Sequence, residues 1–225
     1  MKRLLITVIA LLVLVLAASM ASAATIDLFD WAFNVDRTKY EFTKGDSMPV
    51  NGTLTNGLGT LTWATNVAGS HTIIGFFDHE IDELINTYYN EYGSTGGSPL
   101  AGQSWEIDEP GYSFGNIYVN VLAGSLDNSN GVPSTSPDDV SMAMGWNFSL
   151  LSGQTATLSY FLSGTAPLSG FYLAQTDPDS NASIYFTSSI NIQGGGPQPV
   201  PEPSTLLMLG TALSGIFFFR KRIMK

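Results

Sequence analysis

The chain has 225 residues, contains no cysteine and carries a formal net charge of −10 at pH 7. The missing thiols exclude disulfides, thiolate metal sites and a cysteine nucleophile. Between Ala24 and Phe219 there are three basic and nineteen acidic residues, and no Lys or Arg occurs from Gly45 to Phe219. This excess of negative charge repels phosphate backbones and attracts cations, so we predict no nucleic-acid partner.

The first 23 residues have the pattern of a secretory signal peptide. Two basic residues precede an apolar run from Leu4 to Ala18, and small residues follow it. Ala21 and Ala23 form an A-x-A site, so we expect signal peptidase to cleave before Ala24. An uncleaved anchor is the alternative, although the apolar run is short for a permanent span.

From position 24 to position 192 the sequence predicts one β-rich exported domain. Short runs of β-branched and aromatic residues lie between Gly, Asn and Ser, which are typical of turns. Asn56-Gly57 is a good two-residue hairpin turn. The predicted strands are Thr25–Phe33, Gly52–Leu54, Leu58–Ala64, His71–Phe77, Ser113–Leu122, Gly170–Ala174 and Ser183–Ile192.

Two further strands show the clearest alternation of apolar and polar residues. Apolar side chains occupy every second position from Val140 to Leu150, and the alternation resumes from Ala156 to Leu162 after a short Gly-containing loop. This pattern predicts a hairpin with one buried face. With the other strands, it favours an antiparallel two-sheet β-sandwich, jelly-roll-like in its arrangement.

One segment of the domain has helical rather than strand periodicity. Six apolar or tyrosine side chains between Ile81 and Tyr92 fall on one stripe of an amphipathic helix. Asp78 suits its N-cap and Gly93 its end, so we predict one helix of about 13 residues here.

Acidic residues in this segment and before the predicted hairpin are the weak candidates for a calcium site. They are Asp78, Glu80, Asp138 and Asp139. Capping of the predicted helix is the favoured explanation for the first two. Glu83 stands where a zinc protease helix needs its second histidine, so that kind of site is excluded. No cofactor is predicted, and calcium remains open.

The stretch "WEIDEPGY" places carboxylates beside aromatic rings, as in sugar-binding sites. Its candidate glycan-binding residues are Trp105, Glu106, Asp108, Glu109 and Tyr112. A pair of catalytic carboxylates, as in a glycosidase, is the less favoured alternative. The alternative without a binding role is a solvated strand end that runs into a Pro-Gly turn.

We predict no catalytic residues and therefore a protein that is not an enzyme. The chain has no G-x-S-x-G motif, and its only histidines are His71 and His79. No glycine-rich loop carries the lysine that a nucleotide site requires.

The C-terminal segment combines three features. Residues 193–203 are rich in Gly and Pro and predict an extended linker. An apolar run from Ser204 to Phe219 predicts a short membrane-spanning helix, and the basic tail 220–225 would stay on the cytoplasmic side.

This tail, "VPEPSTLLMLGTALSGIFFFRKR", resembles the PEP-CTERM sorting signal of exported proteins in Gram-negative bacteria. The resemblance implies that Pro201, Glu202 and Pro203 are the motif recognised by exosortase. It also implies that Arg220, Lys221 and Arg222 stop the transient membrane insertion. The domain itself resembles other exported proteins of this kind, more loosely.

By that resemblance, the chain is an exosortase substrate delivered to the outer surface or the extracellular matrix. Signal peptidase and exosortase are its expected partners during export, and exopolysaccharide is a candidate partner afterwards. We expect a structural or glycan-associated protein without enzymatic activity. A calcium-assisted carbohydrate-binding module is the alternative, and a glycoside hydrolase is the less favoured one.

Overall fold

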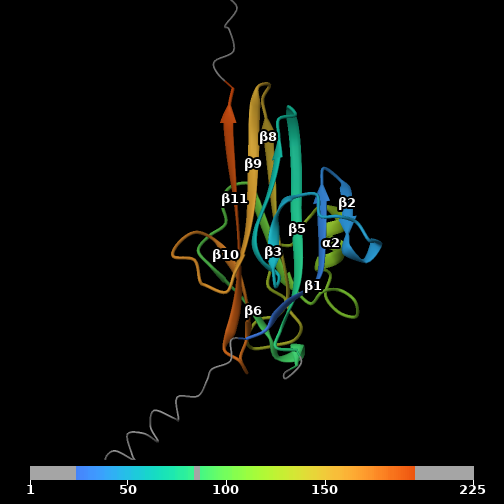
Figure 1. The fold of residues 1–225 in the computed structure, drawn as a ribbon, viewed down its shortest axis with the longest axis vertical. Helices are drawn as coiled ribbons and strands as arrows, with labels where there is room; N and C mark the ends of the chain where they lie inside the picture. Colours follow the sequence, from blue (N-terminus) through green and yellow to red (C-terminus); the bar gives the residue numbers. More distant parts are fainter. Residues whose placement is uncertain (1–23, 84–86, 196–225) are drawn as a thin grey trace, which may run out of the picture.

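Two antiparallel sheets face each other in the computed structural model, which describes residues 24–83 and 87–195 (Figure 1). Sheet A has the order β2-β1-β5-β8-β7, and sheet B has the order β3-β4-β9-β11-β10-β6. The strands of sheet A are β1 (Ile26–Val35), β2 (Thr38–Glu41), β5 (Gly69–Ile81), β7 (Gln103–Asp108) and β8 (Ser141–Leu150). Those of sheet B are β3 (Asn51–Thr55), β4 (Leu58–Thr65), β6 (Tyr92–Gly96), β9 (Gln154–Ser163), β10 (Tyr172–Asp177) and β11 (Ala182–Gly194). The predicted two-sheet β-sandwich is therefore confirmed.

The main core lies between the two sheets and is rich in aromatic side chains. Phe33 and Phe77 of sheet A meet Tyr160 and Phe186 of sheet B, and all four are fully buried. The rings of Phe77 and Phe186 form a T-shaped contact with centroids 5.2 Å apart. Each such side chain stabilises the fold by about 1.5–3 kcal/mol through burial. This core holds the sheets together without disulfides.

A second, smaller core covers the outer face of sheet A. The helix α2 (Ile117–Ala123) buries Ile117 and Val121 against Ile74, Phe76 and Ala143 of the sheet. It contacts β1, β5, β7 and β8, and Figure 1 shows it beside β1. As a result, the middle of sheet A is buried on both faces, whereas an ordinary sandwich sheet exposes one face.

The helix predicted from Asp78 to Gly93 is wrong. Residues 78–81 are the end of β5, Tyr88–Asn90 form a short 3₁₀ helix, and Tyr92–Gly96 form β6. The apolar run before Asp78 extends the strand, because β5 pairs with β1 on one side and β8 on the other. Backbone hydrogen bonds to two neighbouring strands and burial of both faces stabilise the strand more than the local periodicity favours a helix.

The strand predicted from Ser113 to Leu122 is also wrong, because this segment contains α2. Ile117 and Val121 are four residues apart and lie on the same face of the helix. Gly124 follows the helix in the left-handed conformation, with φ of 82°, and its N–H bonds to the carbonyl oxygens of Asn120 and Val121. A glycine after the last helical turn is a stop signal that sequence reasoning missed here.

The predicted hairpin between residues 140 and 162 is wrong in its pairing, although both strands exist. β8 belongs to sheet A and β9 to sheet B, so the short loop between them crosses from one sheet to the other. Alternation along a strand shows that one face is buried, but not which strand lies beside it. Strands β2, β6 and β7 were not predicted.

The turn predicted at Asn56-Gly57 is confirmed between β3 and β4. Its residues have φ values of 50° and 71°, as a two-residue hairpin turn of this kind requires. The Gly57 carbonyl oxygen accepts a hydrogen bond from Nε2 of the buried His79, at 3.0 Å. The turn of sheet B is thereby fixed to the inner face of β5.

Replacement of Gly57 by alanine tests this contact. A Cβ atom at position 57 would lie 2.7 Å from Cδ2 of His79, in addition to the positive φ. We expect Gly57→Ala to lower the free energy of unfolding of the full-length protein by about 2–4 kcal/mol in urea titrations. Gly153→Ala is the control, because its φ is 80° but nothing lies within 4 Å of the added Cβ. Equal losses in the two variants would contradict the contact with His79.

Candidate functional site

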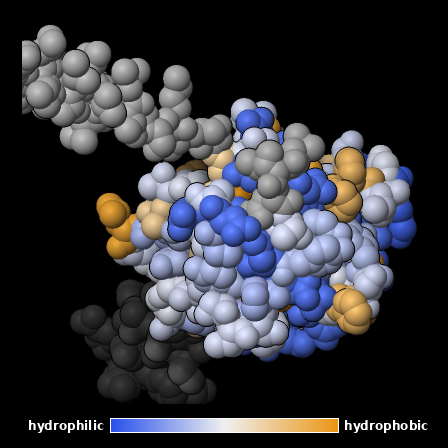
Figure 2. All heavy atoms as spheres, turned by 90° about the horizontal axis from the view of Figure 1, so that it is seen from below, coloured by the Kyte–Doolittle hydropathy of each residue, from blue (hydrophilic) through white to orange (hydrophobic). Residues whose placement is uncertain are grey.

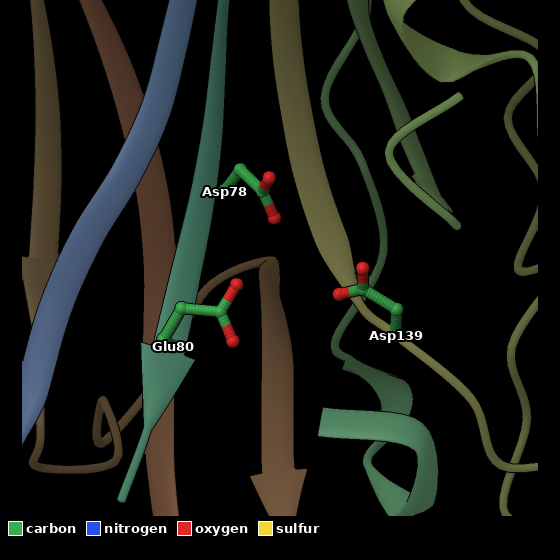
Figure 3. A group of neighbouring side chains, drawn as sticks. All are labelled: Asp78, Glu80 and Asp139. Atoms are coloured by element: carbon green, nitrogen blue, oxygen red, sulfur yellow. The ribbon is translucent and has the colours of Figure 1, made fainter. Parts of the chain in front are cut away.

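Three carboxylates from two separate parts of the chain converge on the outer face of sheet A. Asp78 and Glu80 project from β5, and Asp139 projects toward them from the segment that leads into β8 (Figure 3). One oxygen atom of each side chain lies within 4.8 Å of the others. We call this group the acidic cluster.

Strand geometry explains why these residues meet. Alternate residues of a strand lie on the same face, so Asp78 and Glu80 share the face that carries Ile74 and Phe76. Asp78 pairs with Ser141 across β5 and β8. Asp139, two residues before Ser141, is therefore placed beside Glu80.

The acidic cluster is buried and short of hydrogen-bond donors. Asp78 is 1% exposed and Glu80 is 8% exposed. Neither oxygen of Asp78 has a hydrogen-bond partner, and the same holds for Oε2 of Glu80 and Oδ1 of Asp139. Buried polar atoms in proteins normally have partners, so these atoms call for an explanation.

The proximity of the three acids opposes their ionisation. Burial raises the pKa of Asp78 well above its ordinary value, and the charges of Asp139 and Glu80 raise it further. Burial is also the main cause that raises the pKa of Glu80 to about 7 and that of Asp139 to about 6. Removing all three protons without a compensating cation is therefore costly.

Neighbouring acids on the same face do have partners. Asp30, which pairs with Asp78 across β1 and β5, accepts a hydrogen bond from the hydroxyl of Tyr112 at 2.6 Å. Asp108 accepts one from the backbone N–H of Asn116 at 2.7 Å. The acidic cluster thus differs from these two neighbouring acids.

The chemistry of the acidic cluster is that of hard oxygen ligands. It contains no histidine or cysteine, and carboxylates are the ligands that Ca²⁺ and Mg²⁺ prefer. Lys39 lies away from the acidic cluster. It pairs with Asn34 of β1, and Asn34 pairs with Ile74 of β5, which is four residues or about 13 Å along the strand from Asp78. Lys44 forms an ion pair with Glu41. The arrangement can hold a hard divalent cation.

A pocket of about 290 Å³ lies next to the acidic cluster and shares Asp139 with it. Glu109 and Asp138 contribute further carboxylates. Its aromatic lining consists of Tyr88, Tyr89, Tyr112 and Phe114. We call this the aromatic pocket.

The structure does not bring the five candidate glycan-binding residues together. Trp105 packs toward the core, where its ring contacts Phe171 with centroids 5.7 Å apart. Glu106 lies on the opposite face of β7, where it accepts hydrogen bonds from the side chain of Asn120 and the backbone of Asp127. Together with Asp108, it fixes α2 and the loop after it.

Only Glu109 and Tyr112 of those five line the aromatic pocket. Of the four calcium candidates, Asp78, Glu80 and Asp139 form the acidic cluster, whereas Asp138 lines the pocket. The backbone N–H of Asp138 donates a hydrogen bond to the Glu91 carbonyl oxygen at 3.0 Å.

The two histidines have structural contacts. His79 is buried, and burial lowers its pKa to about 4 although its hydrogen bond to Gly57 acts in the other direction. His71 contacts the carboxylate of Asp36 through Nδ1 and the carbonyl oxygen of Val67 through Nε2.

Several predicted residues lie outside the described part of the chain. These are the signal peptide with Ala21 and Ala23, the sorting motif Pro201, Glu202 and Pro203, the apolar run 204–219, and the basic residues Arg220, Lys221 and Arg222. Ala24 begins the described part and packs against the main core. Within the described residues, no helix has the length and apolar character needed to cross a membrane.

Sequence reasoning named each member of the acidic cluster but did not group Asp139 with Asp78 and Glu80. That grouping depends on the pairing of β5 with β8, which no local pattern predicts. Tyr88, Tyr89 and Phe114 of the aromatic pocket were not identified as site residues, because isolated aromatic residues are also common in cores.

Comparison with known proteins identifies one feature of the chain. Residues 199–222 match the model of the PEP-CTERM protein-sorting motif. The motif supports an exported, membrane-processed protein that exosortase sorts. No curated protein and no solved structure matches the chain.

Glu91 allows a test of how strongly burial and nearby acids raise the pKa of a carboxyl group close to the acidic cluster. Its Oε2 accepts a hydrogen bond from Gln175, and its Oε1 has no partner. Burial raises the pKa of Glu91 to about 9, the hydrogen bond from Gln175 opposes this, and the charges of Glu80, Asp139 and Asp177 raise it. Because the folded state holds this proton more tightly, its stabilising effect is complete below pH 4.5 and is lost as the pH rises toward 9.

We therefore expect Glu91→Gln to reduce the loss of stability between pH 5 and pH 9 by about 1 kcal/mol or more. The measurement is urea unfolding of the full-length protein in chelator at several pH values. Asp46→Asn, which changes an exposed carboxylate, is the control and should leave the pH dependence unchanged. A Glu91→Gln profile parallel to that of the wild type would contradict the raised pKa.

Proposed function

We propose that this protein is a non-enzymatic component of the cell surface or extracellular matrix whose exported β-sandwich associates with glycan. The observation that carries this proposal is the sorting motif at residues 199–222. Its Pro-Glu-Pro, apolar run and basic end are those of a tail that is cut after the domain has crossed the membrane. The described β-sandwich is the part that is delivered.

The surface of the domain supports an extracellular role. The face in Figure 2 is mainly hydrophilic, and its hydrophobic residues form small separate patches. From Gly45 onward the domain has no Lys or Arg. Such an excess of negative charge keeps an exported protein soluble and self-repelling, and the face in Figure 2 offers no broad apolar area for association with another protein.

The aromatic pocket supports the association with glycan. Ring faces stack on the apolar faces of sugars, and carboxylates accept hydrogen bonds from sugar hydroxyls. Phe114 is 71% exposed, and Tyr89 and Tyr112 are exposed as well. Glu109 and Asp138 lie in the same pocket. This pocket replaces the stretch around Trp105 as the proposed glycan site.

Glycoside hydrolysis is the second candidate function, and one observation favours it. Glu109 lines the same pocket as Asp138 and Asp139, and hydrolases of this class use paired carboxylates. Burial raises the pKa of Glu109, as a general acid requires. The carboxylate of Asp139, however, points toward Asp78 and Glu80, which favours binding over catalysis (Figure 3).

Intact-mass measurement of the protein released at the cell surface tests the sorting step. We expect a product that lacks residues 1–23 and the residues beyond Pro203. Alanine substitution of Pro201, Glu202 and Pro203 should leave a membrane-bound product with the basic tail attached. Gln198→Ala, in the same linker, is the control and should be processed normally. A wild-type product that retains Arg220–Lys225 would contradict cleavage of the tail and would indicate a plain membrane anchor.

Retention on the polysaccharide of the producing organism tests the glycan association. We expect Phe114→Ala to reduce retention by about tenfold, because one aromatic–sugar contact is lost. Phe161→Ala is the matched control, since Phe161 is exposed on the outer face of β9 in sheet B.

Equal retention of the wild type and Phe114→Ala would contradict binding at the aromatic pocket. Release of free sugar by the wild type, lost in Glu109→Gln while the fold is intact, would instead establish hydrolysis.

A further inference from the structure

We propose that Asp78, Glu80 and Asp139 form a binding site for Ca²⁺ that fixes the end of β5 to the segment before β8. The site is distinct from the sorting signal and from the aromatic pocket, although Asp139 borders both the site and the pocket. Its ligand set is built by strand pairing rather than by a contiguous calcium-binding loop.

The first reason is the state of Asp78. Asp78 is 1% exposed, its side chain points into the acidic cluster, and both of its oxygen atoms lack a hydrogen-bond partner (Figure 3). A buried carboxylate that serves only the fold is normally satisfied by donors, as Asp30 and Glu106 are. Four unsatisfied oxygens in three converging side chains are explained by one shared cation.

The second reason is the absence of a basic side chain that could do the same. Between Gly45 and Phe219 the sequence offers no Lys or Arg. Lys44 is paired with Glu41, and Lys39 lies on β2 at the far side of β1 from β5. Arg37 is exposed in the turn between β1 and β2. A buried charge without a counter-charge is strongly destabilising, so the ionised cluster requires an external cation.

The ligand chemistry favours calcium among the common cations. One oxygen of each carboxylate lies within 4.8 Å of the others, which is close enough for a small adjustment to bring all three to one ion. Ca²⁺ accepts many oxygen ligands in flexible geometry, whereas Mg²⁺ demands a near-octahedral shell, keeps its waters and usually takes only one or two carboxylates. Three carboxylates supply three to six ligands, and Ca²⁺ takes six to eight, so waters complete the shell. Zn²⁺ prefers nitrogen and sulfur ligands, which are missing here.

Calcium binding and thermal unfolding of the full-length protein in detergent test the site. After treatment with chelator, calorimetric titration with CaCl₂ should show one ion bound per chain. At about a hundred times the dissociation constant, calcium should raise the melting temperature by about 5–10 °C.

Asp78→Asn separates a ligand from a merely structural residue. Without calcium, the variant should melt at the same temperature as the wild type or higher, because an unpaired buried carboxylate has been neutralised. With calcium it should melt below the wild type, and its calcium affinity should fall at least tenfold. The order of the two melting temperatures, wild type against variant, should therefore reverse when calcium is added. Glu80→Gln should show the same reversal and serves if Asp78→Asn does not fold.

Asp127→Asn is the matched control, because it removes the same charge from an exposed position. It should behave as the wild type does in both conditions. Absence of calcium binding in the wild type would overturn the proposal. So would Asp78→Asn with unchanged affinity, or an equal loss of affinity in Asp127→Asn. A larger response to Mg²⁺ than to Ca²⁺ would overturn the choice of ion.

Discussion

Burial of negative charge on the outer face of sheet A is the constraint on which the rest of this structure depends. The helix α2 covers the middle of that face, and Asp30, Asp78, Glu80 and Glu106 are all buried. Asp108 and Glu106 are compensated by the covering layer itself, since they accept hydrogen bonds from the backbone or side chains around α2. Asp78 is not. On this face, the buried carboxylate oxygens that lack a hydrogen-bond partner belong to the acidic cluster.

The packing of α2 on sheet A explains why the two-sheet sandwich could be predicted from the sequence whereas the full length of β5 could not. Alternation from Ala156 to Leu162 predicted a strand correctly, because sheet B has one buried and one exposed face there. β5 has no such alternation, since its outer face is buried beneath α2. Acids on a strand that is buried on both faces are rare, so Asp78 and Glu80 were assigned to the first turn of a helix, where acids are common.

The candidate site was predictable residue by residue but not as an assembly. Asp78, Glu80 and Asp139 were each named from local composition, and their convergence required the pairing of Asp78 with Ser141. Conversely, Trp105 and Glu106 are adjacent in sequence, which suggested one surface. Neighbouring residues of a strand point to opposite faces, and these two lie on opposite sides of β7. Sequence proximity is informative within a turn and misleading within a strand.

Asp139 connects the two proposals, because it belongs to the acidic cluster and also lines the aromatic pocket. Without a cation, the pocket presents three carboxylates in close succession and would repel an acidic glycan. A Ca²⁺ ion held by Asp78, Glu80 and Asp139 would offset two of the three negative charges of the ionised cluster and would fix the segment that carries Asp138. Neutral sugars would gain from this only through the ordering of the pocket, whereas acidic sugars would also gain because the repulsion is reduced. We therefore expect calcium to help acidic matrix glycans more than neutral ones, even though every ionisable side chain that lines the described pocket is itself an acid or a tyrosine.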